Sequence, residues 1–467
     1  MLAPGRFERR IAAIGTVSLL SAFLFFGALA YWQVWRTDLA NGAHNPRALA
    51  SFEDPLRGRI LDRGGNELAV SLPNGQRRYT DASVAHAVGY LDARFGSQGA
   101  ELVFNEALSG TVAPSFRSAV NAEFQRTGER GLDVRLTLDP TIQRAAANAL
   151  GARKGAVIAL DPRNGEVLAM VSVPTYDPGA LATVGDSLAN DPNSPLLNRA
   201  TQGLYPPGST FKTVTASSLL ENKVIAPDTI VTCKDKVVID GFPISCGNVV
   251  QGPGTYPFKN AFAFSVNAIF AEQGVKLGWD RLLETASKFG FGSRLAFTLP
   301  TAKTQVHSPG SEQTKTLLAS TAFGQGEILA TPLQMVEIAA IIANDGVLMS
   351  PHLGLASMDG ERVVQKLEQP SSKRVLPSDV ARTMRDLMVA VIDNGQAAGV
   401  AMPGVKIGGK TGTAELSDDG TSHAWFIAFA PADKPVIAVA VVVERGGRGG
   451  EVASPIAGQV IRAALNR

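Results

Sequence analysis

Gly155 to Pro174 carries the sequence GAVIALDPRNGEVLAMVSVP, in which two apolar, β-rich runs flank an Asp-Pro-Arg-Asn-Gly turn. This pattern predicts a β-hairpin. Near the other end of the chain, residues 424–430 and 436–443 form two further strand-like runs, and residues 455–466 have the pattern of a closing helix. The residues between these ends are richer in helical pattern. We therefore predict an α/β (α+β) fold, in which helices flank an antiparallel sheet that carries an inserted helical subdomain.

The residues before this hairpin form a polar, mixed segment. Residues 57–63, RGRILDR, have an extended pattern, and a further strand is expected at residues 132–138. A helix is expected to begin near Asp139-Pro140, because proline is favoured in the first turn of a helix. A chain of 467 residues is too long for one domain of usual size. We predict an N-terminal pedestal domain at 36–150 and a larger domain at 151–467.

An uncharged, largely apolar run from Ile11 to Trp35 is long enough to cross about 30 Å of hydrocarbon as one helix. Three arginines lie among residues 1–10, so the positive-inside bias keeps this N-terminus cytoplasmic and sends the rest of the chain outside. A cleaved signal peptide is the alternative, because Ala28-Leu29-Ala30 resembles a cleavage site, although the apolar run is long for one. We predict a single-pass signal anchor at 11–35 in the cytoplasmic membrane.

Charge and composition argue against several classes of protein. Lysine and arginine number 44 against 42 aspartates and glutamates, and the net charge of +2 gives no basic field for nucleic acid. The five histidines are scattered and far in sequence from the two cysteines, so no zinc-ligand spacing results, and no metal or other cofactor is expected. In an exported chain Cys233 and Cys246 can form a disulfide, and two free thiols are the alternative.

The first candidate site lies in YPPGSTFKT, residues 205–213. Two prolines and a glycine interrupt the chain before an apolar helical run, so Ser209 falls at a helix start and Lys212 lies one turn later on the same face. A serine hydroxyl becomes a good nucleophile when a neighbouring base removes its proton. A lysine serves as that base when burial or a nearby cation lowers its pKa. The alternative is a serine N-cap followed by a solvated lysine.

Two further motifs follow in the chain. Ser265-Val266-Asn267 supplies a hydroxyl that could relay a proton and an amide that could hold a carbonyl or the lysine, although local hydrogen bonds in a turn are the alternative. In residues 407–415, IGGKTGTAE, glycines would let a substrate approach an edge strand, while Lys410 could bind a carboxylate and favour a neutral Lys212. Ser-x-x-Lys, Ser-x-Asn and Lys-Thr-Gly each occur once, although a chance Lys-Thr-Gly is expected at only ~1 in 8,000 positions. The ordered trio therefore predicts an active site.

Residues 404–411 also satisfy the phosphate-binding pattern G-x-x-x-x-G-K-[ST], which would make the chain a nucleotide hydrolase. That pattern has a mechanism only where it joins a buried strand to a helix whose N-terminus faces phosphate. Here Ala401-Met402-Pro403 precedes it, and residues 414–422 follow it without a helical period. The context therefore argues against nucleotide binding.

The three motifs resemble those of the penicillin-binding proteins, and the chain looks like a short class B member of the penicillin-binding protein A type. The resemblance extends to residues 57–63, to residues 155–178, to Tyr205-Pro206-Pro207-Gly208 and to Gly324-Gln325-Gly326. A class A protein would carry a glycosyltransferase domain, for which the N-terminal segment is too short. The resemblance implies a serine β-lactamase/transpeptidase-like fold, with the transpeptidase domain at 151–467.

The resemblance also implies a function. Such an enzyme cross-links peptidoglycan stem peptides that end in D-alanyl-D-alanine, passes through an acyl-serine and is blocked by β-lactams. Its implied partners are those peptides, β-lactam antibiotics, the membrane and a SEDS-type glycan polymerase. The backbone amides of the serine and of Thr413 would form the oxyanion hole. The implied residues are Ser209 as nucleophile, Lys212 as general base, Ser265 and Asn267 for proton transfer and substrate seating, Lys410 with Thr411 for the substrate carboxylate, and Gly412 and Thr413 for substrate binding.

Other functions share this chemistry and remain alternatives. A D,D-carboxypeptidase would pass the acyl group to water, and a β-lactamase or β-lactam sensor would carry the same three motifs. A non-catalytic scaffold would hold a polymerase through its anchor. The sequence leaves open which amine is the acceptor and whether the chain acts in elongation, division or sporulation.

Overall fold

The computed structural model describes residues 16–18, 20–25, 27–28, 31, 57–110, 130–246, 253–368, 371–393, 397–416 and 420–466. Across these ranges, no helix is both long enough and apolar enough to cross a membrane. Most of the predicted anchor at 11–35 lies outside the described residues, as do residues 1–10. The anchor and its orientation therefore stay predictions.

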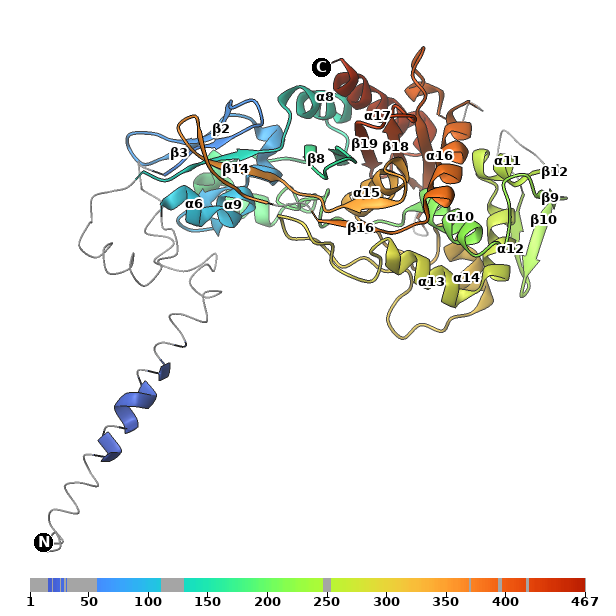
Figure 1. The fold of residues 1–467 in the computed structure, drawn as a ribbon, viewed down its shortest axis with the longest axis horizontal. Coiled ribbons are helices and arrows are strands. Elements are labelled where there is room, and N and C mark those ends of the chain that lie inside the picture. The colour runs from blue at the N-terminus through green and yellow to red at the C-terminus, as the bar shows by residue number, and fades with distance from the viewer. Residues whose placement is uncertain are drawn as a thin grey trace, which may run out of the picture.

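A five-stranded antiparallel sheet forms the centre of the larger part of the fold (Figure 1). In spatial order its strands are β17 (Gly408–Glu415), β18 (Ser422–Ala430), β19 (Ile437–Val443), β7 (Gly155–Leu160) and β8 (Val167–Val173). The predicted hairpin of β7 and β8 pairs with the strands near the C-terminus, because Ile158 lies opposite Ala440. Every residue of β19 is buried, as expected for an apolar strand covered on both faces. The predicted antiparallel sheet is confirmed.

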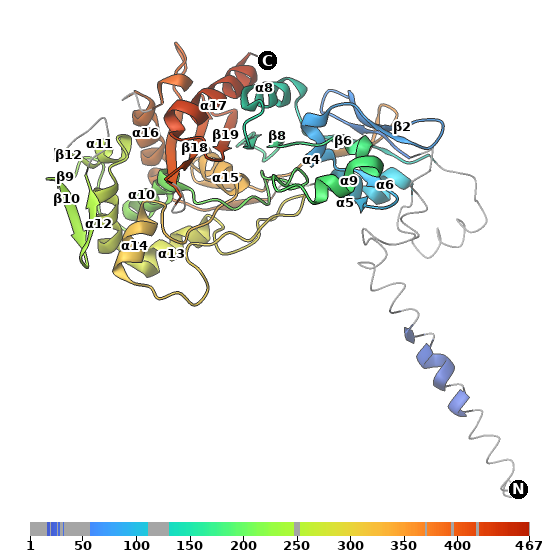
Figure 2. The same cartoon turned by 180° about the vertical axis from the view of Figure 1, so that it is seen from behind.

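Helices cover both faces of this sheet. On one face α8 (Pro140–Leu150) packs against α17 (Gly449–Leu465), and α15 (Pro332–Ala343) lies on the other, as Figures 1 and 2 show from opposite sides. A further helix, α16 (Ser378–Asp393), packs against β17. α8 begins where the sequence predicts, because the Asp139 carboxylate accepts hydrogen bonds from two backbone amides of its first turn.

α17 begins earlier than predicted. The sequence pattern starts this helix at Pro455, whereas the observed helix already begins at Gly449. Gly449 lies so close to the sheet that a Cβ there would be 2.1 Å from the Trp425 carbonyl oxygen. The start of α17 therefore depends on its contact with the strands, and the local sequence pattern does not indicate that contact.

Most of the α-helices named in this structure lie between β8 and β17, in agreement with the predicted helical insertion. Figure 1 shows α10 to α14 gathered at the end of the molecule farthest from the N-terminal sheet. The α-helices of this stretch not yet named are α9 (Leu181–Ala189), α10 (Lys212–Glu221), α11 (Phe258–Ala263), α12 (Asn267–Leu277), α13 (Trp279–Lys288) and α14 (Lys315–Ala322), and its short 3₁₀ turns are η3 (Pro178–Ala180), η4 (Gly208–Phe211) and η5 (Ala398–Val400).

A second sheet of six strands lies at the N-terminal end. In order its strands are β15 (Arg362–Lys366), β14 (Gly354–Asp359), β6 (Asp133–Leu136), β1 (Ile60–Leu61), β2 (Glu67–Ser71) and β3 (Arg77–Tyr79). The strands expected at 57–63 and 132–138 are β1 and β6, which pair in parallel. Around this sheet lie η2 (Ala82–Val84), α4 (Ala85–Val88), β4 (Leu91–Asp92), β5 (Gly96–Ser97), α5 (Gly99–Val103) and α6 (Asn105–Ser109).

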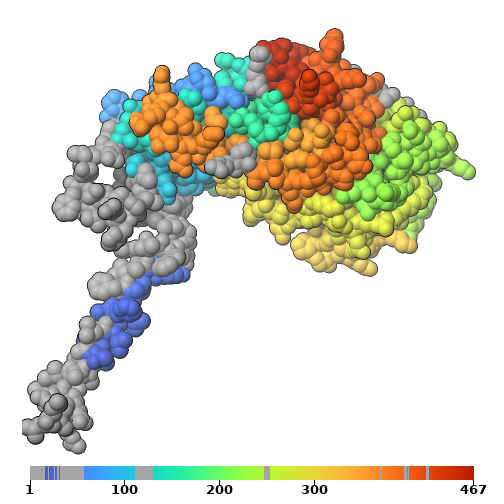
Figure 3. All heavy atoms as spheres, in the orientation of Figure 1, coloured from blue at the N-terminus to red at the C-terminus, as the bar shows by residue number. Residues whose placement is uncertain are grey.

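Two strands of this N-terminal sheet come from a distant part of the sequence. β14 pairs with β6, and β15 forms the sheet edge beyond it. In the space-filling view of Figure 3 this later hairpin lies among the N-terminal residues. This pairing was not predicted from the sequence, because a local pattern indicates a strand but not its partner. The predicted boundary at 150 stays a prediction.

Three two-stranded sheets are formed by the described residues between β8 and β17. Cys233 and Cys246 form a disulfide across a Cα separation of 5.8 Å, which decides between the two alternatives that the sequence left open. The disulfide closes the loop that contains the hairpin of β10 and β11. The small sheets pair β9 (Ile230–Cys233) with β12 (Gly254–Pro257), β10 (Lys236–Ile239) with β11 (Phe242–Ser245), and β13 (Val347–Met349) with β16 (Ser372–Arg374).

Candidate active site

Ser209 and Lys212 lie together at the start of a helix. Ser209 is in the 3₁₀ turn η4, and Lys212 is the first residue of α10, which continues from it. The Lys212 Nζ atom lies 3.0 Å from Ser209 Oγ, within hydrogen-bonding distance. The Lys212 side chain is fully buried, so the alternative of a solvated lysine is excluded.

The second motif closes around the same amine. Lys212 Nζ also lies 2.7 Å from the Ser265 carbonyl oxygen, 3.0 Å from Ser265 Oγ and 2.6 Å from Asn267 Oδ1. Asn267 is the first residue of α12, and Ser265 lies in the short connection from α11 with a φ of +63°. A non-glycine residue in the left-handed backbone conformation costs about 1–3 kcal/mol, and such residues cluster at active sites. The strained backbone here directs both polar groups of residue 265 at the lysine.

The third motif reaches the same hydroxyl from the sheet. Lys410 lies in β17, the edge strand of the central sheet, and its Nζ donates to Ser265 Oγ at 3.0 Å and to the Thr411 carbonyl at 3.2 Å. Ser265 Oγ therefore bridges Lys212 and Lys410. All five residues predicted to be catalytic, Ser209, Lys212, Ser265, Asn267 and Lys410, are brought together by η4, α10, the α11–α12 connection, α12 and β17.

Burial controls the protonation of both lysines. Burial, and secondarily the charge of Lys410, lowers the pKa of Lys212 well below its usual range. Burial alone lowers the pKa of Lys410 to about 7. The ring of Phe270 lies 5.4 Å from Lys212 Nζ, and the ring of Phe262 lies 5.7 Å from Lys410 Nζ, so apolar rings replace water on one side of each amine. An unprotonated amine next to Ser209 is the form that can accept a proton.

Glycines allow the serine turn to lie directly against β17. Gly208 has a φ of +53°, and a Cβ there would lie 2.8 Å from the Thr413 carbonyl oxygen. A Cβ on Gly412 would lie 2.9 Å from the Thr210 methyl group, and one on Gly324 would lie 1.8 Å from the Gly208 carbonyl oxygen. These contacts give a physical reason why glycine occupies positions 208, 324 and 412. They also place the Ser209 turn beside Thr413, whose backbone was expected to help form the oxyanion hole.

The groups that support this turn were not predicted from the sequence. Glu444, the residue after β19, accepts hydrogen bonds from Arg199 Nε at 2.7 Å and from the Tyr205 hydroxyl at 2.8 Å. Trp425 Nε1 donates to the Pro206 carbonyl at 3.0 Å. Neither Arg199 nor Glu444 belongs to a recognisable motif. The available signal was a charged residue directly after a fully apolar strand.

The structure excludes the phosphate-binding alternative. Residues 408–411 of the pattern belong to β17, and a strand, not a helix, follows Lys410. Among the described residues no group of histidine, cysteine, aspartate or glutamate side chains could hold a metal ion.

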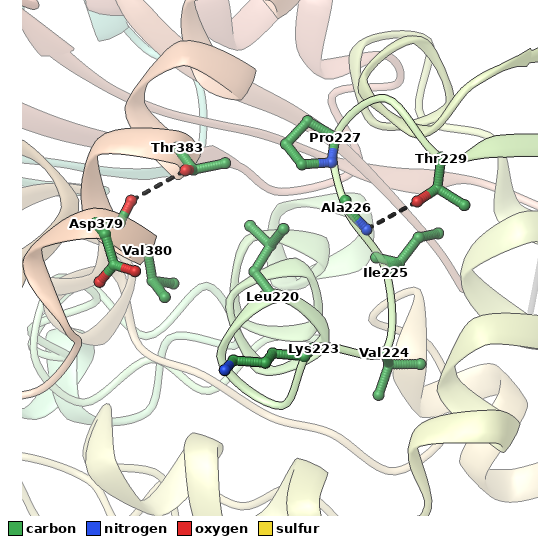
Figure 4. A pocket seen from close by; sticks show the side chains of 10 residues that line it. All are labelled: Leu220, Lys223, Val224, Ile225, Ala226, Pro227, Thr229, Asp379, Val380 and Thr383. Atoms are coloured by element: carbon green, nitrogen blue, oxygen red, sulfur yellow. Dashed lines mark hydrogen bonds between the residues drawn. The ribbon is translucent and has the colours of Figure 1, made fainter.

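A cavity of about 420 Å³ lies elsewhere, between the end of α10 and the start of α16 (Figure 4). Two of its polar side chains make local hydrogen bonds, since the Thr383 hydroxyl donates to the Asp379 carbonyl and Thr229 Oγ1 accepts from the Ala226 amide. None of the predicted site residues lines it. The cavity is therefore separate from the cluster around Ser209.

The fold and the buried serine–lysine pair together define an acyl-serine class of enzyme that includes the penicillin-binding proteins. Residues 155–462 match the family model of the penicillin binding protein transpeptidase domain, and residues 57–134 match that of the penicillin binding protein A dimerisation domain. The first match covers more than half of the chain. The chain therefore belongs to the penicillin-binding protein transpeptidase family.

Relatives and solved structures agree with this assignment. The chain is 36% identical to the peptidoglycan D,D-transpeptidase PbpA of Mycolicibacterium smegmatis, over 93% of this chain and 94% of the relative. It is 35% identical to PbpA of Mycobacterium tuberculosis, over 98% of each chain. The structure of penicillin-binding protein A from M. tuberculosis as a ceftriaxone acyl-enzyme complex superposes with a TM-score of 0.81 at 34% identity. That superposition covers 89% of this chain and 100% of the other.

Lys410→Ala should move the acidic limb of the acylation profile to higher pH. The charge of Lys410 lowers the pKa of Lys212, so its removal raises that pKa, and a higher pH is then needed to leave Lys212 unprotonated. The measurement is the second-order rate constant for labelling by a fluorescent penicillin across roughly pH 5 to 9. Lys434→Ala, an exposed lysine in the loop before β19, serves as the control. A uniform loss of rate with an unmoved limb would contradict this electrostatic role.

Proposed function

We propose that the chain is a peptidoglycan D,D-transpeptidase that cross-links stem peptides through an ester to Ser209 and is inhibited by β-lactams. The contact between Ser209 Oγ and the buried Lys212 amine is the observation that supports this most directly. Membership in the penicillin-binding family supports the same reaction.

In the acylation step Lys212 accepts the Ser209 proton while Oγ attacks the carbonyl of the penultimate D-alanine. The new C–O bond forms, the C–N bond breaks, and the proton passes through Lys212 and Ser265 to the departing D-alanine amine. Backbone amides of Ser209 and Thr413 are suited to the transient oxyanion, since donors aimed at developing charge commonly supply the largest part of catalysis in acyl transfer.

In the second step the amine of a neighbouring stem peptide attacks the ester. A C–N bond forms, the C–O bond to Ser209 breaks, and the amine proton returns through Lys212 to Oγ. Asn267 holds Lys212 in place with a 2.6 Å hydrogen bond throughout. A β-lactam acylates the same oxygen but leaves a bulky ester behind.

The substrate carboxylate is proposed to bind at β17. Lys410, Thr411 and Thr413 lie on this edge strand, where an extended peptide can lie alongside. With a pKa of about 7 in the free site, Lys410 gains positive charge when an anion binds beside it. Binding of the carboxylate thus makes Lys410 more positively charged. That charge lowers the pKa of Lys212 and so favours its neutral form.

The sequence also supports a membrane-bound role. We infer that residues 11–35 anchor the chain, that 36–150 form a pedestal outside the membrane, and that a SEDS-type polymerase supplies the glycan strands. The apolar run and the arginines before it support the anchor, and the resemblance to class B penicillin-binding proteins implies the polymerase partner.

Reconstitution with membrane-bound glycan precursor and a polymerase should yield cross-linked peptide dimers together with released D-alanine. Mass spectrometry of muramidase digests separates the outcomes, because dimers and shortened monomers differ in mass. Protein treated beforehand with penicillin is the control and should give neither product. Shortened monomers without dimers would instead establish a D,D-carboxypeptidase, and labelling without either product would indicate a sensor.

Replacement of residues 11–35 by an unrelated single-pass anchor should reduce cross-linking of polymerase-made glycan while leaving penicillin labelling of the detergent-solubilised protein intact. The reason is that the proposed partner contact lies in the membrane, whereas acylation needs only the soluble site. Co-purification of the polymerase checks the contact directly. Undiminished cross-linking and co-purification by the exchanged chain would contradict a role for this segment in partner binding.

A further inference from the structure

A single carboxylate gathers three groups behind the serine turn. Glu444 accepts hydrogen bonds from Arg199 Nε at 2.7 Å and from the Tyr205 hydroxyl at 2.8 Å, and Lys154 Nζ lies 3.4 Å away. The Arg199 side chain is only 2% exposed and that of Glu444 17%. Burial raises the pKa of Glu444, but the hydrogen bonds and charges of its partners outweigh it and leave the pKa lowered. The carboxylate is therefore ionised at neutral pH.

Arg199 uses its remaining nitrogens on its own segment. Nη1 donates to the Ser194 carbonyl at 2.9 Å, and Nη2 donates to the Asn193 carbonyl at 2.6 Å. The guanidinium therefore ties the loop that leads toward Tyr205 to the end of the central strand β19, where Glu444 lies. A charge-assisted pair of this geometry is stronger than a neutral hydrogen bond.

Tyr205 is held from several directions. Its backbone exchanges hydrogen bonds with Ala330 at 3.0 and 2.9 Å, and its ring lies edge-on to His423 and Trp425, with centroids 5.3 and 6.0 Å away. The hydroxyl bond to Glu444 fixes the far end of the ring. The position of this side chain is thus determined at both ends.

The chain between Tyr205 and Ser209 has little freedom. Pro206 and Pro207 have φ locked by their rings, and the Pro206 carbonyl accepts from Trp425 Nε1. Gly208 is confined between Thr413 and Gly324, as its close approaches show. A displacement at Tyr205 is therefore passed on to Ser209 and is not absorbed by the intervening residues.

We propose that Glu444 is a positioning residue for acyl transfer, which acts through Tyr205 and Arg199 to hold the Ser209 turn at attacking distance. This inference rests on the proposed acylation of Ser209. A misplacement of about 1 Å at a nucleophile costs on the order of 100-fold in rate. Glu444 touches neither Ser209 nor Lys212, so its effect is on geometry and not on proton transfer.

The test measures the acylation rate constant and the dissociation constant for a chromogenic cephalosporin separately, by stopped flow, in Tyr205→Phe, Glu444→Gln and Glu444→Ala. Tyr205→Phe removes one oxygen and keeps the ring, and it should lower the rate constant by about tenfold or more. The dissociation constant and the pH of the acidic limb should not change. Glu444→Gln keeps an oxygen that can accept from Tyr205, so it should lose less than Glu444→Ala.

Two controls make the test specific. Tyr256→Phe is a matched control, because that buried hydroxyl has no hydrogen-bond partner among the described residues, and it should acylate at the unmodified rate. In the double variant Tyr205→Phe/Glu444→Ala the loss should be smaller than the product of the two single losses, since each change alone already removes the hydrogen bond between Tyr205 and Glu444. Thermal unfolding confirms that each variant is folded, and Tyr205→Phe decides the matter where a Glu444 variant does not fold.

The outcomes are distinct. The positioning role would be overturned if folded Tyr205→Phe and Glu444→Gln were acylated with the same rate constant as the unsubstituted protein. A higher dissociation constant with an unchanged acylation rate constant would also overturn it. Fully independent losses in the double variant would also overturn it. Failure of the unmodified protein to acylate at all would instead overturn the proposed function.

Discussion

Two buried lysine amines share one serine hydroxyl, and the chemistry of the site depends on that arrangement. Lys212 Nζ and Lys410 Nζ each lie 3.0 Å from Ser265 Oγ, and both side chains are fully buried. Burying an unpaired ammonium costs several kcal/mol, and two of them so close together would also repel each other. The lowered pKa values of both groups relieve this conflict, because a neutral Lys212 removes most of it. The fold therefore makes a base out of a residue that is ordinarily protonated.

The architecture serves to bring these groups together from distant parts of the chain. The serine turn, the α11–α12 connection and the sheet edge each supply one motif. Close packing that only glycine permits, at Gly208, Gly324 and Gly412, presses the turn against β17. The left-handed backbone conformation of Ser265 is locally unfavourable, but it directs both the hydroxyl and the carbonyl of this residue at Lys212. Burial of the two lysines, backbone strain at Ser265 and the close glycine contacts therefore all act on the cluster around Ser209.

Much of this was predictable from sequence, for identifiable reasons. Continuous apolar, β-rich runs marked the central strands, Asp139-Pro140 marked a helix start, and the Ser209 and Lys212 spacing placed both on one helical turn. The features that the sequence did not predict depend on contacts that form only in the folded chain. The β14–β6 pairing and the early start of α17 depend on partners far away in sequence. Arg199 and Glu444 carry no motif, because their meaning lies in a contact between a loop and a strand end.

The central claim is that Ser209 Oγ is the atom that becomes acylated, and identification of the modified atom tests it most directly. Protein labelled with penicillin G, denatured and digested with protease should show the penicilloyl mass on the peptide that contains Ser209. Ser209→Ala, checked for folding by thermal unfolding, should carry no added mass. An adduct mapped to another residue, or a labelled Ser209→Ala protein, would contradict the account.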